Sequence, residues 1–390
     1  MIPRIEYIFL KKIIEKKNII FVTSLFIIAL LLRISGRNFL SGDMQRFLIP
    51  WFIEIKGNGG LHSLTEQVGD YGLLYQTLIS LMTYIDINPL YLYKLLSVIF
   101  DIFLAYSVYK VVKLTNPKQS KIVSIISGGV IMLLPTVIIN SSYWGQCDSM
   151  YSFFCISCLY QLHKESYLKS FIFLGLAFAC KLQSVFILPF IFFYYLKDRR
   201  FSVLYFLISI FVVWLVGIIA FCEGRSLLTP IEIYHYQTFE YQAMYMNFPS
   251  FWMIAGNDYS TLKVPSVLFT GLLVLVGGFY YLSNEKYQGK NEFWQVVTWF
   301  VWTMVLFLPS MHERYAYLLD ILLILLCFEN HRFIKYAIIT SCLSLYAYGN
   351  YLFDRERNPY MQFCAFLFVL TYVSFSYSLL VSTKERTCLK

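Results

Sequence analysis

Long apolar runs that alternate with short polar segments dominate this sequence. A helix needs about 20 predominantly apolar residues to cross the hydrocarbon core of a bilayer. The runs together predict an all-α polytopic membrane protein with about twelve transmembrane helices. They fall at 19–36, 89–112, 122–139, 149–162, 167–180, 183–196, 201–222, 264–283, 293–309, 315–328, 333–352 and 360–381.

Composition supports this fold class and excludes others. Apolar residues make up 58% of the 390 residues and charged residues 14%, whereas a soluble domain has about 45–50% and about 25%. These values exclude a soluble enzyme, a disordered protein and a coiled coil. An outer-membrane β-barrel is disfavoured, because its strands alternate apolar and polar residues and these runs are continuous. We interpret 1–390 as a single integral membrane domain.

The basic residues predict how the chain crosses the membrane. The net charge is +9, and because cytoplasmic loops are rich in Lys and Arg, this charge indicates topology and no nucleic-acid partner. With twelve spans and both termini cytoplasmic, the inside segments hold 21 of the 32 Lys and Arg residues. We therefore expect a multi-pass protein of the cell membrane. A short run at 72–85 is predicted to be an interfacial helix, because a thirteenth span would place the basic loop 110–121 outside.

Two long segments, 37–88 and 223–263, and three short turns, 140–148, 181–183 and 311–314, face outward in this topology. Fifteen of the 23 acidic residues lie in these segments or within the membrane. Polar clusters at the ends of membrane helices are costly unless they line a cavity. The outer face, extracellular or periplasmic, is therefore the predicted functional surface.

The first outer segment holds the candidate catalytic residue. Asp43 lies just after the first apolar run, in Ser-Gly-Asp-Met-Gln-Arg. It is either a solvated loop carboxylate or, in a partly apolar cleft, a base that takes a proton from a sugar hydroxyl. Arg46 lies one helical turn later and can orient Asp43 or bind a phosphate. Asp70, followed by Tyr71 at the start of the interfacial run, offers a second carboxylate.

A polar patch also occupies the outer turn at 142–149, which contains Trp144, Gln146 and Asp148. The aromatic residues of this turn can anchor the membrane interface, and Asp148 can cap the next helix. Those roles leave Gln146 unexplained, because a glutamine and an aspartate beside a glycine serve no anchoring purpose. We interpret the three side chains as candidate substrate contacts.

The two remaining outer turns carry cations. Lys181 is the only cation between two apolar runs and precedes Gln183. It either extends to the lipid headgroups or pairs with a lipid-linked phosphate. His312, Glu313 and Arg314 follow one another between two apolar helices. We interpret His312 and Arg314 as anion ligands and Glu313 as their partner, with a structural ion pair as the alternative.

No metal site is predicted. The His-Glu pair at 312–313 has no second histidine four residues later, so it does not match a zinc motif. Cys155 and Cys158 have CxxC spacing, but they lie in an apolar run without a second pair or a nearby histidine. A redox or metal-binding role for these cysteines is therefore disfavoured.

Three further positions have competing interpretations. The aromatic segment 232–252 suits sugar stacking, a lipid-facing lid or a plain interfacial loop, and we include its His235 among the substrate-binding candidates. Asp101 and Asp320 lie within predicted spans, where a carboxylate is a functional candidate by default. Because neither lies near the outer end of its span, we favour hydrogen bonding between helices.

These motifs resemble bacterial multipass glycosyltransferases of the GT-C superfamily, in the group related to the PIG-V type GPI mannosyltransferases. The similarity runs through SGDMQRFLIPW, GDY, KLLSVIFDIFLAYSVYK, SYWGQCDSMY, LGLAFACKLQSVFILP and LPSMHERYAY, in this order. The resemblance implies a GT-C-like helix bundle, a polyprenyl-phosphate sugar donor, and Asp43 as the catalytic base. It also implies donor or acceptor contacts for Trp144, Gly145, Gln146, Asp148, Lys181, Gln183, His312, Glu313 and Arg314.

The first outer segment departs from that superfamily in one respect. Many members have a DD or ExD pair there, whereas Asp43 is a single carboxylate followed by Met44. This difference favours a metal-independent mechanism. We therefore expect no required cofactor, and a divalent metal is not supported.

The expected function is that of a hexosyltransferase in cell-envelope glycan or glycoconjugate synthesis. It moves one sugar, with inversion, from a polyprenyl-phosphate donor to a hydroxyl of a glycan, glycolipid or protein. No dinucleotide or P-loop motif is present, as expected for a lipid-linked donor. The alternatives are a polysaccharide polymerase or ligase and a flippase of lipid-linked glycans. A flippase would need broken helices and repeat symmetry, which the sequence does not show.

Overall fold

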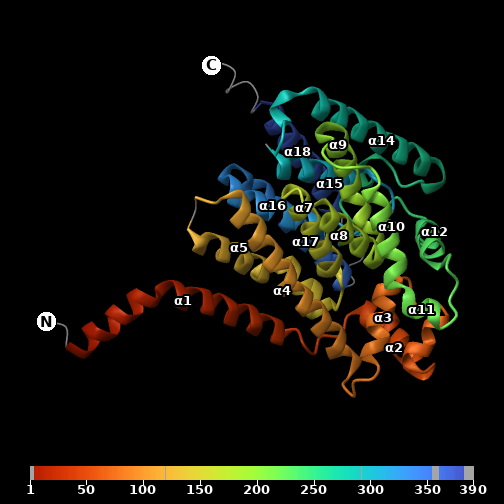
Figure 1. Ribbon diagram of the computed structural model, residues 1–390, viewed down its shortest axis with the longest axis horizontal. Helices are drawn as coiled ribbons and strands as arrows, with labels where there is room; N and C mark the ends of the chain where they lie inside the picture. Colours follow the sequence, from red (N-terminus) through yellow and green to blue (C-terminus); the bar gives the residue numbers. More distant parts are fainter. Residues whose placement is uncertain (1–3, 119, 291, 354–359, 382–390) are drawn as a thin grey trace.

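The computed structural model describes residues 4–118, 120–290, 292–353 and 360–381, and these residues are almost entirely helical (Figure 1). Four helices are long: α1 (Arg4–Ser35), α4 (Pro89–Thr115), α14 (Tyr259–Ser283) and α18 (Tyr360–Val381). Each contains a stretch that is long and apolar enough to cross a membrane. The predicted all-α membrane fold is confirmed at this level.

The other helices are shorter, and every predicted apolar run contains at least one helix. Four of them are apolar helices of 10 to 17 residues: α3, α8, α10 and α15. Within the described residues, four helices, or five if one bent pair counts as a span, meet the length and composition expected of a crossing. The shorter helices within the predicted runs are α3 (Leu73–Met82), α5 (Lys121–Leu133), α6 (Pro135–Ile138), α7 (Asp148–His163), α8 (Tyr167–Cys180), α9 (Leu188–Asp198), α10 (Tyr205–Val216), α11 (Ile218–Cys222), α15 (Phe293–Phe307), α16 (Tyr317–Glu329) and α17 (Ile334–Leu352).

The bent pair consists of α5 and the stretch Pro135–Trp144, which begins with α6, and their axes differ by 50°. The break lies at Pro135, which has no N–H to continue the hydrogen-bond ladder of a helix. A π-helical turn, η3 (Ile139–Trp144), follows and ends at Gly145, whose φ of +76° suits glycine. The bend and the turn together carry the polar segment after η3 into the interior.

The first long outer segment folds into short helices. It contains η1 (Met44–Leu48), α2 (Ile49–Gly57), η2 (Gly60–Thr65) and α3. The ten residues of α3 rise about 15 Å, half the thickness of a hydrocarbon core. This length agrees with the interfacial helix predicted at 72–85. In Figure 1, α2 and α3 (orange) lie with α11 (green) at one end of the bundle.

The core lies between the central helices, whereas the outer helices expose apolar side chains. Trp302 of α15 and Leu322 of α16 are fully buried. In contrast, Leu268 and Phe279 of α14 are 67% and 71% exposed. Exposed apolar surface of this extent is unfavourable in water and suits contact with lipid chains.

A buried ion pair attaches α1 to the bundle. Arg33 Nη2 donates to Asp101 Oδ2 of α4 at 2.8 Å, and Ser141 Oγ donates to the same oxygen at 2.7 Å. Arg33 Nη1 also donates to the Met132 carbonyl, near the end of α5, at 2.7 Å. Asp101 therefore links helices, as the sequence predicts. Asp320 of α16 is also buried away from the candidate site described below.

The second long outer segment is tied to the turn before α16. It contains α12 (Thr229–Glu240), β1 (Tyr245–Met246) and α13 (Trp252–Ala255). β1 pairs in parallel with β2 (Met311–His312), with Met246 opposite His312. Ser310 Oγ donates to the carbonyls of Tyr241 and Ala243 at 3.0 Å each. The pairing places the two segments side by side.

Candidate active site

A polar cavity of about 320 Å³ lies where the predicted outer segments meet. It receives residues from the first segment, from all three short turns and from the segment before β1. Most of the residues selected from the sequence line it. They are Asp43, Arg46, Asp70, Tyr71, Gln146, Lys181, Gln183, His312, Glu313 and Arg314.

Asp43 is buried at the start of η1 and fully oriented by hydrogen bonds. Its Oδ2 atom accepts from Trp144 Nε1 at 3.0 Å and from Gln146 Nε2 at 2.7 Å. Its Oδ1 atom accepts from the hydroxyl of Tyr351. The alternative of a solvated loop carboxylate is therefore wrong.

This arrangement leaves one acceptor position on the carboxylate. An ionised carboxylate has about four lone-pair positions, two on each oxygen. The two donors on Oδ2 use that oxygen fully, whereas the single donor Tyr351 leaves one position on Oδ1. Because Asp43 lines the cavity, a hydroxyl in the cavity can donate to this remaining position.

Tyr71 fixes the orientation of one of those donors. The Tyr71 hydroxyl donates to Gln146 Oε1 at 2.9 Å, which leaves Gln146 Nε2 facing Asp43. Trp144 is fully buried, so it does not serve as an aromatic anchor at the membrane interface. Trp144, Gln146 and Tyr71 together determine where the Asp43 carboxylate points.

A second carboxylate, Asp148, is paired with a cation. It accepts from the ammonium of Lys181 and from Asn140 Nδ2, the latter at 2.7 Å. It is the first residue of α7, and the N-cap position that precedes the helix belongs to Cys147. Lys181 is only 5% exposed, so it does not extend to lipid headgroups. Each of the two side chains is the counterion of the other.

Arg314 connects the two carboxylates. Its Nη1 atom lies 3.8 Å from Asp43 Oδ2 and its Nε atom lies 3.5 Å from Asp148 Oδ2. Nη1 also donates to Glu313 Oε1 at 3.2 Å. The guanidinium group lies 5.7 Å from the centre of the Trp144 ring. Arg314 therefore balances negative charge that the fold has already buried.

His312 and Glu313, the two residues that precede Arg314 in the chain, do not carry a full charge at neutral pH. Burial raises the pKa of Glu313 to about 7, and the nearby Arg314 opposes that rise. Burial, and then the charges of Arg314 and Lys181, lower the pKa of His312 to about 3. His312 is therefore a neutral imidazole, which can donate one hydrogen bond to an anion but adds no charge.

Arg46 is the available cation at this site. It lines the cavity and is exposed. Within the described residues it forms no ion pair, whereas Lys181 and Arg314 both face carboxylates. An anionic group entering the cavity would therefore meet Arg46 without displacing a protein carboxylate.

Asp70 and Gln183 complete the wall of the cavity. Burial, together with the charge of Glu240, raises the pKa of Asp70. The backbone carbonyl of Asp70 accepts a hydrogen bond from Gln237 of α12. Gln183 Oε1 is buried and has no hydrogen-bond partner within the described residues, so it is free to accept from a ligand.

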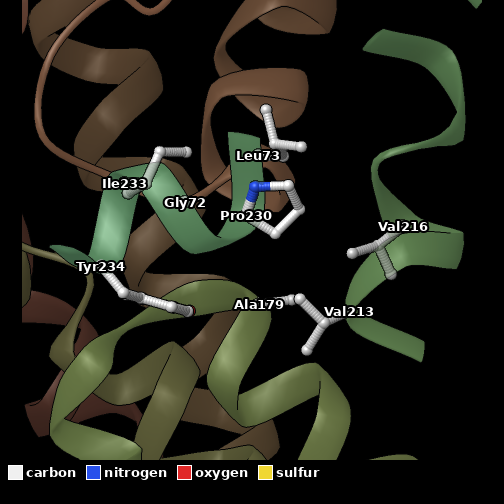
Figure 2. Close-up of a pocket in the computed structure, with 8 residues that line it drawn as sticks. All are labelled: Gly72, Leu73, Ala179, Val213, Val216, Pro230, Ile233 and Tyr234. Carbon is white, nitrogen blue, oxygen red and sulfur yellow. The ribbon is translucent and has the colours of Figure 1, made fainter. Parts of the chain in front are cut away.

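His235 lies outside this cavity. It lines an apolar groove of about 570 Å³ between α8, α10 and α12. Figure 2 shows a separate, smaller pocket lined by Leu73, Ala179, Val213 and Tyr234, among others. Val213, Pro230 and Tyr234 line both this pocket and the groove. Gln237 lines the polar cavity and the next residue of α12, Thr238, lines the groove, so both reach neighbouring positions of α12.

Sequence reasoning missed Tyr351 and Asn140. Tyr351 lies at the predicted outer end of its apolar run, but it is one of 32 tyrosines, and its partner Asp43 is 308 residues away. Asn140 begins a predicted outer turn, and its position eight residues before Asp148 is a usable signal.

The described residues contain no group of three or more His, Cys, Asp or Glu side chains that could hold a metal ion. A scan against models of known protein families gave no match, and a search of curated proteins found no similar sequence.

Proposed function

We propose that this protein is an inverting glycosyltransferase that moves one sugar from a polyprenyl-phosphate donor to an acceptor hydroxyl. The observation that carries the proposal is the Asp43 carboxylate, which is buried, held by three donors and open to a further hydroxyl in a polar cavity. A groove lined by apolar residues lies nearby, with Thr238 of the groove next to Gln237 of the cavity on α12. A lipid-linked sugar needs a polar cavity for its sugar and an apolar groove for its lipid chain.

The Asp43 carboxylate takes the proton of the acceptor hydroxyl in the proposed reaction. The acceptor oxygen forms a bond to the anomeric carbon on the face opposite the phosphate. The bond between the anomeric carbon and the phosphate oxygen breaks, and its electron pair leaves with polyprenyl phosphate. The configuration at the anomeric carbon is inverted, and no cofactor enters the balance.

The leaving phosphate gains negative charge as this bond breaks. Arg46, which forms no ion pair among the described residues, lines the cavity and binds this phosphate in the proposal. Arg314 and the N–H of His312 lie in the same cavity and stabilise the growing charge. Fixed donors of this kind, aimed at developing charge, often supply the largest contribution to catalysis. The polyprenyl chain lies in the groove between α8, α10 and α12.

The proposal includes the membrane topology predicted from the basic loops. Twelve crossings require that some spans consist of short helices, such as α7 and α8, or of two consecutive helices, such as α10 and α11 on either side of Gly217. The termini are then cytoplasmic, and the cavity opens on the extracellular or periplasmic side. Support comes from the origin of the cavity walls, since each of the five segments predicted to face outward contributes to them.

The alternative functions predict other features. A flippase is expected to have broken helices in both halves of the chain, and the described residues contain one bent pair. A polymerase or ligase would transfer an entire lipid-linked glycan, so the length of the product separates it from a transferase of single sugars.

The experiment that tests the proposal compares wild type, Asp43→Asn and Asp86→Asn with a panel of synthetic polyprenyl-phosphate sugars. Asp86 is exposed in the same outer segment and lies outside the cavity, so it is the matched control. We expect wild type and Asp86→Asn to release polyprenyl phosphate from one sugar donor of the panel. The release rate of Asp43→Asn should be at least 100-fold lower. Turnover by Asp43→Asn would contradict the assigned base, and no release with any sugar would contradict the function.

A further inference from the structure

A second cavity, of about 500 Å³, adjoins the candidate active site. Its walls come from α2, from the turn before α3 and from the α11–α12 region. Trp51 and Asp70 line both cavities, so the two adjoin at these residues. No step of the proposed reaction uses the second cavity, which we call the Trp51 cleft (Trp51, Gln67, Asp70, Arg225, Glu232 and Tyr236).

The indole of Trp51 is a fixed aromatic wall of this cleft. The backbone of Gly69 packs against it, at a φ of +75°, and a Cβ atom at Gly69 would lie 2.6 Å from Trp51 Cδ2. The rings of Phe47 and Tyr71 flank Trp51 at 5.8 and 5.9 Å between centroids. A rigid, half-buried indole offers a flat apolar surface at little cost in conformational entropy.

The only cation of the cleft is already paired with protein groups. Arg225 is buried and donates to the Leu64 carbonyl at 3.2 Å, to Thr229 Oγ1 at 3.3 Å and to Gln67 Oε1. The amide of Gln67 donates to the carbonyls of Gly69 and Tyr71 at 2.7 and 2.9 Å. Neither side chain therefore has its main hydrogen-bonding groups free for a ligand.

The free polar groups of the cleft are hydrogen-bond acceptors. Within the described residues, the carboxylates of Asp70 and Glu232 make no hydrogen bond or ion pair, and both line the cleft. Two unpaired carboxylates repel an anion and accept strongly from hydroxyl donors. A ligand that suits these surroundings is uncharged, carries several hydroxyls and has an apolar face for Trp51.

We propose that the Trp51 cleft binds the acceptor and that this acceptor is a neutral oligosaccharide. A pyranose ring has this combination of features, with C–H groups on its faces and hydroxyls around its edge. A saccharide in the cleft extends one hydroxyl past Asp70 into the cavity that contains Asp43. The assignment of this ligand as the acceptor rests on the proposed function, whereas saccharide binding does not.

Binding is measured by titration calorimetry on the full-length protein in lipid nanodiscs, which avoids detergents with sugar headgroups. The probes are chitotriose, mannotriose, maltotriose and cellotriose, together with a hexapeptide containing Ser and Thr. The variants are Glu232→Ala, which changes an exposed position on α12, and Trp51→Ala. Glu54→Ala, at an exposed position on α2 outside the cleft, is the matched control.

We expect at least one trisaccharide to bind wild type and Glu54→Ala equally, and to bind Glu232→Ala and Trp51→Ala at least tenfold more weakly. Because Glu232 is exposed, Glu232→Ala remains informative if Trp51→Ala does not fold. The proposal is overturned if no trisaccharide binds, if only the peptide binds, or if Glu232→Ala binds as wild type does.

Donor cleavage separates the failure of this inference from the failure of the proposed function. With a cleavable donor and no acceptor, Glu232→Ala should hydrolyse the donor at the wild-type rate, while its KM for the trisaccharide rises at least tenfold. A wild type that binds saccharide but cleaves no donor would contradict the transferase and leave the cleft assignment intact. Cleavage with an unchanged saccharide KM in Glu232→Ala would contradict the cleft alone.

Discussion

Side chains in the candidate site are held by opposite charges and hydrogen bonds. Lys181 and Asp148 are buried together, and Arg314 approaches the same carboxylate. Removing one member of a buried ion pair leaves the other without a counter-charge in a medium of low polarity. The sequence presents Lys181 as an isolated cation, but in the fold its charge serves Asp148.

The variant Lys181→Met is therefore expected to lose stability. Breaking a buried pair costs about 3–5 kcal/mol, and the residual contact of Arg314 with Asp148 keeps the loss near the lower value. Thermal unfolding of the purified protein measures the effect. Lys169→Met, at an exposed position of α8, should unfold as wild type does. The double variant Lys181→Met/Asp148→Asn should recover part of the loss, and no recovery would show that the pair is not the cause.

The titration of Glu313 gives the site a dependence on pH. Its pKa is raised to about 7 by burial, so Glu313 is mostly neutral below pH 7 and mostly charged above it. The charged form neutralises Arg314 and repels the phosphate of the donor. The KM for donor should therefore rise several-fold between pH 6 and pH 8, and this rise should disappear in Glu313→Gln. The control is Glu54→Gln, and a rise that persists in Glu313→Gln would contradict this role.

At the level of elements, the turn that joins η3 to α7 positions both donors to Asp43 Oδ2. Gly145 lies in this turn at a φ of +76°, and a Cβ atom there would overlap the terminal methyl of Met44. Met44 is fully buried and follows Asp43 directly, so it has little space to move. A methyl group at position 145 would therefore displace the candidate base relative to Trp144 and Gln146.

The variant Gly145→Ala should lose transfer activity, and Gly224→Ala should not. Gly224 also has a positive φ, of +105°, but no atom lies within 4 Å of its Cβ position. Both variants lose about 1 kcal/mol of stability from the left-handed backbone, whereas only Gly145→Ala should lower the transfer rate, by tenfold or more. Thermal unfolding and initial rates are measured side by side. Equal rates in the two variants would contradict the importance of the turn.

The helices were predictable from the sequence, because continuous apolar runs determine where a membrane chain forms helices. The side chains of the site were also recognisable, since polar residues at the ends of such runs need a reason to be there. Their partners were not. Gln146 reaches Asp43 across 103 residues and Lys181 reaches Asp148 across 33. Neither sequence periodicity nor motif spacing encodes such contacts, so the roles of Lys181 and His312 were decided only by the fold.

For the whole molecule, the topology determines which side of the membrane the cavity faces. Asn58, after α2, lies with the outer segments, whereas Arg199, after α9, lies on a predicted cytoplasmic loop, and both are exposed. Asn58→Cys and Arg199→Cys, each in a background without other cysteines, allow the two sides to be compared.

In intact cells, a membrane-impermeant maleimide should label Asn58→Cys but not Arg199→Cys. After lysis it should label both, because both positions are exposed to solvent. Labelling of Arg199→Cys alone in intact cells would place the cavity on the cytoplasmic side and contradict the proposed orientation.

The contact between Asp43 and Tyr351 joins residues that are 308 positions apart. A chain leaving the ribosome exposes Asp43 first, but the hydroxyl that completes its surroundings is synthesised 308 residues later. A partly made protein in the membrane therefore has the carboxylate without its full set of donors. Activity should appear only after α17 has been made and has packed beside η1.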